Sequence, residues 1–163
     1  MLRLDPSCAV FTSTHLLLIR LCMHARTYTY ALPILDKYVC HFPASFSHVT
    51  SKFPLLPCAA HDSSLSFITE SSGLSSKLAY KDYLQYFLLG GMVYMALKQW
   101  GKAAHYLGVV ISMPTPGPIS MIMVEAYKKW ILVKLLENGK VSEYSRGLCP
   151  PWIFLSNSKT FRR

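Results

Sequence analysis

Apolar side chains recur at helical spacing on both sides of a short polar stretch in the second half of the chain. Two apolar segments of about a dozen residues each flank residues 99–102 (QWGK), within the range 83–114. So short a stretch between two such segments leaves room only for a tight turn. The pattern therefore predicts two helices folded into a hairpin over residues 83–114.

The residue types in this hairpin match part of the tetratricopeptide repeat pattern. Phe87 and Tyr94 lie two turns apart on one predicted helix face, and Ala103 is small enough to let the second helix approach closely. Two adjacent glycines inside a helix cost about 1 kcal/mol each relative to alanine, so we expect Gly90 and Gly91 to serve close packing. A phosphate-binding role for this pair is disfavoured, because no GK[ST] follows and the pair does not begin a helix.

The N-terminal part repeats this arrangement less regularly. Thr12 or Ser13 is predicted to cap a helix that runs through residues 15–24, and a second helix is predicted over 29–41 with Pro33 in its first turn. Ala31 stands where Ala103 stands in the other hairpin, at the same distance after the first helix. Together the two copies predict an irregular helical repeat.

A third helix is predicted over residues 119–138, with Gly139 as its C-cap. Its solvated stripe is expected at Glu125, Lys128 and Lys129. The side chains expected to supply apolar cover are Met121, Ile122, Val124, Tyr127, Trp130, Ile131 and Leu135.

The remaining segments carry no sustained periodicity. Residues 43–76 are rich in Ser and Pro, so we expect a low-order insert, and residues 142–163 are expected to form a divergent, disordered tail. The predicted fold is therefore all-α: antiparallel helical hairpins stacked as a short TPR-like α-solenoid with a long loop insert, over residues 1–141.

Hydrophobic residues make up 52% of the chain and the mean hydropathy is +0.27, so membrane insertion has to be weighed. The longest uncharged apolar run, residues 87–97, is far shorter than the roughly 20 residues that a span needs. Residues 12–22 contain Arg20, and no small-residue cleavage site follows. We therefore predict neither a membrane span nor a signal peptide.

The five cysteines form no C-x2-C pair and are odd in number, which indicates reduced thiols that pack as small hydrophobic residues. Cys22 with His24, and Cys40 with His41, lack a second ligand pair, so no metal site is predicted. The net charge of +9 favours acidic partners, but the cations are scattered and not interleaved with aromatic residues. Nucleic-acid binding is therefore not expected.

Motifs that would indicate catalysis are missing from the sequence, including a nucleophile elbow, HExxH and Walker A. The few acidic residues are thinly distributed, and His105 is interpreted as a residue at the polar edge of its helix. We therefore predict a protein that is not an enzyme, uses no cofactor and has no small-molecule substrate.

Several stretches resemble, in order, subunit 3 of the COP9 signalosome. They are residues 4–8 (LDPSC), 12–22 (TSTHLLLIRLC), 31–36 (ALPILD), 86–94 (YFLLGGMVY) and 124–133 (VEAYKKWILV). The block at 125–133 is the most specific piece, and the serine-rich insert ending at 72–77 looks most like fungal members. The resemblance covers roughly residues 2–141.

This resemblance implies a scaffold subunit of the complex that removes the ubiquitin-like modifier Nedd8 from cullins, present in nucleus and cytoplasm. In that family helical hairpins precede a winged-helix PCI domain, and catalysis belongs to a different, zinc-containing subunit. No stretch here resembles the PCI domain, so we expect a truncated chain that holds only the repeats. The PCI subunits of the proteasome lid share the architecture and are an alternative identity.

Two functions from different classes follow. The first is a scaffold that binds the other COP9 signalosome subunits through apolar helix faces, since a truncated array leaves an uncovered end. The alternative is a peripheral membrane-associated basic helical protein, because a positive charge attracts anionic lipid. Salt-sensitive vesicle binding that depends on Lys128 and Lys129 would distinguish the second from the first.

Overall fold

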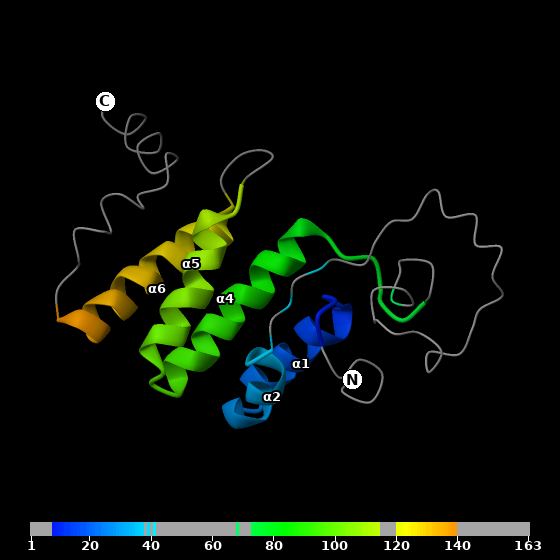
Figure 1. Ribbon diagram of the computed structural model, residues 1–163, viewed down its shortest axis with the longest axis horizontal. Helices are drawn as coiled ribbons and strands as arrows, with labels where there is room; N and C mark the ends of the chain where they lie inside the picture. Colours follow the sequence, from blue (N-terminus) through cyan, green and yellow to red (C-terminus); the bar gives the residue numbers. More distant parts are fainter. Residues whose placement is uncertain are drawn as a thin grey trace. The chain divides into compact units, whose positions relative to one another are not determined.

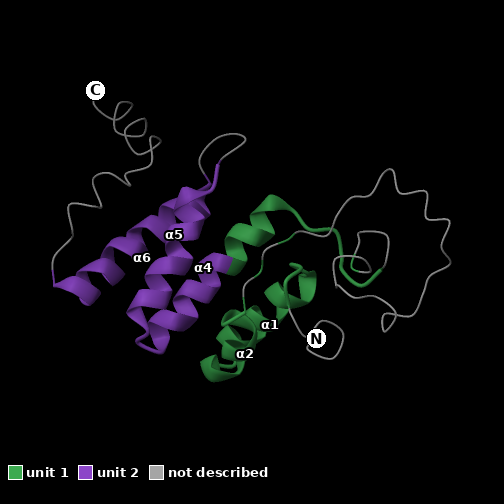
Figure 2. Ribbon diagram, in the orientation of Figure 1, with its two compact units in different colours: residues 1–86 green, residues 87–163 purple. Residues whose placement is uncertain are grey.

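The structure is a computed structural model of the chain, and it describes residues 8–37, 39, 41, 68, 73–114 and 120–139. The chain divides into two compact units, Met1–Tyr86 and Phe87–Arg163 (Figure 2). The regular elements of the described residues are α1 (Ser13–His24), the 3-10 helix η1 (Tyr28–Ala31), α2 (Leu32–Leu35), α4 (Tyr80–Ala96), α5 (Trp100–Ser112) and α6 (Met121–Asn138) (Figure 1). The prediction of an all-α protein is confirmed.

Helix α1 begins at a capping box built with a histidine. The backbone N–H of Thr12 donates to Nδ1 of His15 at 3.1 Å, and the side chain of Thr12 accepts from the backbone N–H of His15. This places His15 where a capping box usually has Glu or Gln. The side chain of His15 is buried, so its ring fills the core as well as the cap. The prediction that Thr12 caps this helix is confirmed.

Helix α1 ends in a Schellman motif whose left-handed residue is not glycine. Arg26 has a φ of 55°, and its N–H donates to the carbonyl of Met23 at 3.3 Å. The N–H of Thr27 donates to the carbonyl of Cys22 at 3.0 Å, which completes the pair of bonds that defines the motif. A left-handed conformation at a residue with a Cβ costs about 1 kcal/mol, so Arg26 is held there against its own preference.

The second predicted helix is much shorter than expected. Helix η1 and α2 together end at Leu35, with Pro33 in the first turn of α2, where its missing N–H costs no helical bond. The N–H of Phe11 donates to the carbonyl of His41 at 2.7 Å, and the N–H of His41 donates to the carbonyl of Ala9 at 3.0 Å. These bonds form an isolated parallel bridge between Val10 and His41 and occupy the backbone groups that a helix would need. The prediction of a helix through His41 is therefore wrong.

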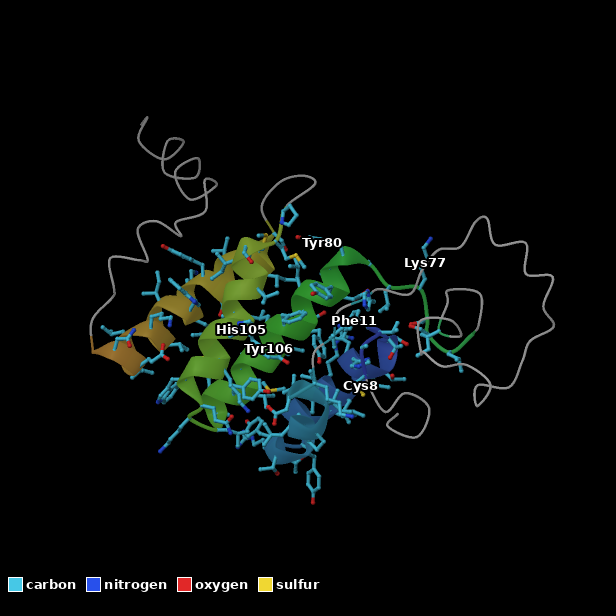
Figure 3. The ribbon with its side chains drawn as sticks, in the orientation of Figure 1. Cys8, Phe11, Lys77, Tyr80, His105 and Tyr106 are labelled. Atoms are coloured by element: carbon cyan, nitrogen blue, oxygen red, sulfur yellow. The ribbon has the colours of Figure 1, made fainter. Side chains whose placement is uncertain are left out.

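The core of the first unit is an aromatic cluster around Phe11. The ring of Phe11 lies 5.1 Å from that of Tyr86 and 5.6 Å from that of Tyr83, both in edge-to-face geometry, and 5.8 Å from that of His15 (Figure 3). Both tyrosines belong to the first two turns of α4. Edge-to-face pairs add about 0.5–1.5 kcal/mol each beyond their buried area. The cluster therefore joins the residues before α1 to the start of α4.

Cys22 lies on the buried side of α1, with only 4% of its surface exposed. Desolvation raises the pKa of its thiol above the ordinary value of 9.0. A raised pKa stabilises the folded chain below pH 9.0, and this contribution is lost as the pH rises through the folded-state value.

The thiolate is the reactive form, so we expect iodoacetamide at pH 8 to modify Cys22 at least about tenfold more slowly in the folded chain than in denaturant. Mass spectrometry of the Cys22 peptide measures both rates, and equal rates would contradict the buried placement.

In the second unit, α4 and α5 form the predicted hairpin. The turn lies at Leu97, Lys98 and Gln99, where Lys98 has a φ of 59°. The N–H of Lys98 donates to the carbonyl of Met95 at 3.0 Å, and that of Gln99 donates to the carbonyl of Tyr94 at 2.9 Å. This is again a Schellman motif, so α5 begins at Trp100 and not after the predicted QWGK turn.

Helices α5 and α6 pack antiparallel over at least two turns. A Cβ added to Gly101 would lie 3.3 Å from Oε1 of Glu137, and one added to Gly108 would lie 3.8 Å from Nε1 of Trp130. The second contact lies seven residues later along α5 and seven residues earlier along α6, as an antiparallel register requires. Gly139 ends α6 with a φ of 66°, so the predicted C-cap is confirmed.

Several predicted features lie largely or wholly outside the described residues. They are the insert 43–76, apart from Ile68 and residues 73–76, and the tail 142–163. No helix among the described segments is long and apolar enough to cross a membrane. The domain boundary at residue 141 stays a prediction.

Candidate protein-binding surface

The packing residues predicted in the hairpin lie between α4 and α5. A Cβ on Gly91 would lie 2.8 Å from Cγ and 2.9 Å from Cδ2 of Leu107, distances that real Cβ atoms do not show. Leu107 is fully buried, so its side chain has little room to move away. The helices therefore approach closely where residue 91 has no side chain.

A tyrosine of α5 fills the space beside this close approach. The ring of Tyr106 lies 5.2 Å from that of Phe87 and 5.1 Å from that of Tyr94 (Figure 3). Nζ of Lys102 lies 5.4 Å from the centre of the Tyr94 ring, within the range of a cation–π contact. All the predicted packing residues are buried: Phe87, Gly90, Gly91, Tyr94 and Ala103 in this unit, and Ala31 in the first unit. Tyr106 was not predicted, although its position three residues after Ala103 puts it near the same helix face.

Helix α6 buries one face and exposes another that is also apolar. The buried residues of α6 are Met123, Ala126, Trp130 and Val133. Near its C-terminal end Leu132, Leu135 and Leu136 are 54%, 44% and 60% exposed. Spacings of three and four residues place these side chains side by side, and we call them the α6 leucine patch. Trp130 is buried as predicted, but Leu135 and Met121 are exposed, so that part of the predicted apolar cover is wrong.

The charged side chains of α6 form pairs within the helix. Nζ of Lys129 lies 2.8 Å from Oε1 of Glu125, and Nζ of Lys134 lies 2.7 Å from Oε2 of Glu137. The hydrogen bond and the charge of Lys129 lower the pKa of Glu125. The pair therefore stabilises the folded chain above the ordinary pKa of that carboxyl, and this stabilisation is lost as the pH falls through the lowered pKa. Each ion pair cancels its own charge. Lys128 is exposed four residues before Leu132, so a positive charge lies beside the α6 leucine patch.

The chemistry that these residues can perform is packing against another polypeptide. Within the described segments no three His, Cys, Asp or Glu side chains lie close enough to hold a metal ion. His105 is exposed on α5, with its ring 6.1 Å from that of Tyr106 (Figure 3). Half-exposed leucines at helical spacing are the anchors with which one helix engages another.

Comparisons with known proteins agree with a helical-repeat architecture. Residues 61–148 match the family model described as COP9 signalosome complex subunit 3, N-terminal helical repeats. The chain is 52% identical to COP9 signalosome complex subunit 3 of Emericella nidulans, over 81% of this chain and 26% of that protein. The proteins of the same name from Neurospora crassa and Dictyostelium discoideum are 34% and 27% identical, over 86% and 91% of this chain and 28% of each relative.

The chain thus spans about a quarter of the length of these relatives. The matched range contains α4, α5 and α6, which are the helices that form the hairpin and the α6 leucine patch. On this match over more than half of its residues, the chain belongs to the family of COP9 signalosome complex subunit 3.

Proposed function

We propose that the chain is a non-catalytic scaffold subunit of the COP9 signalosome, acting in nucleus and cytoplasm. It supports removal of the ubiquitin-like modifier Nedd8 from cullins by holding other subunits of the complex through protein–protein contacts. Family membership supports the complex, and the α6 leucine patch is the observation that supports binding through helix faces.

The α6 leucine patch offers three exposed leucines to a neighbouring helix. Fully burying one leucine side chain contributes about 1.5–3 kcal/mol, so three leucines that are already half covered have about 2–4 kcal/mol left to gain. That gain corresponds to at least about a tenfold change in affinity. The face opposite the patch packs against α5, so one helix can hold the hairpin on one side and a neighbouring subunit on the other.

The test replaces Leu132, Leu135 and Leu136 by glutamine in the tagged chain and measures its recovery with the other signalosome subunits of Emericella nidulans, co-expressed and purified. Glutamine keeps helix propensity similar to leucine, so the helix remains while the apolar contact is lost. We expect at least about a tenfold loss of the co-purified subunits. Lys81→Gln, an exposed change on α4, is the control and should leave recovery unchanged.

Far-UV circular dichroism checks that the triple variant keeps its helix content. Full recovery of the complex with the triple variant would contradict binding through the α6 leucine patch. Failure of the unchanged chain to recover any signalosome subunit would contradict the proposed function itself.

A further inference from the structure

A separate exposed apolar strip lies in the first unit, on α1. Leu17 and Leu21 are one helical turn apart and are 56% and 57% exposed. The opposite side of the helix is buried through Leu16, Ile19 and Cys22. Helix α1 therefore presents an apolar pair away from its own core.

The charged residue of α1 beside this pair, Arg20, is positive. Arg20 and His24 are exposed on the same side of α1, which contains no acidic residue. Nη2 of Arg20 donates to Oε1 of Gln85 at 2.6 Å, and because that amide is neutral it orients the guanidinium without cancelling its charge. Asp82, an acidic residue of the same unit, accepts from the N–H of Ala79 at 2.9 Å at the start of α4.

Arg26 adds a cation at the end of α1 in a position that favours glycine. Its φ of 55° closes the Schellman motif, and its side chain is exposed. An arginine in a left-handed conformation costs stability that glycine would not. The cations thus flank the leucine pair along the helix and at its C-terminal end.

We propose that Leu17 and Leu21, with Arg20 and Arg26, dock an acidic amphipathic helix of a partner protein. The partner helix carries apolar residues one turn apart, which pack on the leucine pair, and carboxylates beside them, which face the two arginines. The proposal rests on the scaffold function and names the chemistry of one partner surface. A second copy of this chain fits poorly, because a symmetric contact would place the same cations opposite one another.

The test measures binding of a synthetic helical peptide by fluorescence anisotropy to the purified 163-residue chain. The peptide has leucines at i and i+4 flanked by glutamates, and a matched peptide has lysine in place of each glutamate. We expect the acidic peptide to bind at least about tenfold more tightly than the basic one, with affinity falling as salt increases. The double variants Leu17→Gln/Leu21→Gln and Arg20→Gln/Arg26→Gln should each weaken binding about tenfold.

Lys128→Gln on α6 is the control and should bind as the unchanged chain does. Arg26→Gln alone removes a charge that lies outside the helix, so its loss of binding cannot come from the Arg20–Gln85 hydrogen bond. The proposal is overturned if the two peptides bind equally, if neither binds, or if the α1 variants bind normally. It is also overturned if vesicles containing phosphatidylserine displace the acidic peptide and the α1 variants weaken binding of those vesicles. Signalosome recovery, measured separately, reports on the scaffold function and not on this peptide.

Discussion

Replacing Gly91 by valine is expected to destabilise the second unit by about 3 kcal/mol, at the upper end of the usual cost of overfilling a core. Its Cβ would lie 2.8 Å from Cγ of Leu107, and the two additional methyl groups would enter the same space. Because Leu107 is fully buried, the conflict can be relieved only by moving α5 away from α4. Urea unfolding followed by circular dichroism measures the change in unfolding free energy.

Two further variants separate steric conflict from general damage. Gly91→Val with Leu107→Ala should be less destabilised than the sum of the single changes, because the alanine leaves room for the valine. Gly108→Ala is the matched glycine control: its Cβ would lie 3.8 Å from Trp130, an ordinary contact, so the helix should gain up to about 1 kcal/mol. Additive effects in the double variant would show that α4 and α5 do not meet at residue 91.

Replacing Phe11 by alanine is expected to cost about 3–5 kcal/mol, comparable to the whole stability of a small unit. The fully buried ring contacts His15, Tyr83 and Tyr86, and its loss would leave a cavity between α1 and the start of α4. Urea unfolding measures the loss of unfolding free energy, and near-ultraviolet circular dichroism reports on the packing of the tyrosines.

Phe11→Leu is the control for this cavity. Leucine refills most of the volume and loses only the edge-to-face contacts, so it should cost about 1–2 kcal/mol. An equal cost for alanine and leucine would mean that the aromatic contacts, not the filled space, hold Phe11. A negligible cost for alanine would place Phe11 outside the core.

The sequence predicts the hairpin and α6 because their apolar spacing is strong and their ends carry local signals. Gly139 stops α6 where a left-handed residue was expected. The turn between α4 and α5 was predicted at residues 99–102, which is too late, because Lys98 adopts the left-handed conformation and α5 already begins at Trp100. The hydrogen bonds that close this motif are local, from Lys98 to Met95 and from Gln99 to Tyr94, but a lysine at residue 98 does not indicate a left-handed residue as a glycine would.

The second helix could not be predicted correctly from local periodicity. The segment after Leu35 is apolar enough for a helix, but His41 pairs its backbone with Ala9 and Phe11, about 30 residues away in sequence. Such pairing depends on which distant segment the chain folds back onto, and local periodicity does not show this. The same limit applies to His15, whose place in a capping box is visible only once its ring meets the Thr12 N–H.

The sequence predicted binding through apolar helix faces, but it did not predict which residues form the candidate surface. The predicted apolar cover included Leu135 and left out Met123 and Val133, whereas Met123 and Val133 are buried and Leu135 is exposed. A helix that is apolar around most of its circumference does not reveal which side is buried first. The structure decides this through Gly108, which lets Trp130 approach α5.

Hydrogen–deuterium exchange of the chain, alone and in complex with the other signalosome subunits, tests most directly whether helix faces bind those subunits. Covering the α6 leucine patch would stabilise the last turns of α6 against local opening, so their amides should exchange at least about tenfold more slowly in the complex. Unchanged exchange across residues 130–139 in a complex that does form would contradict the account.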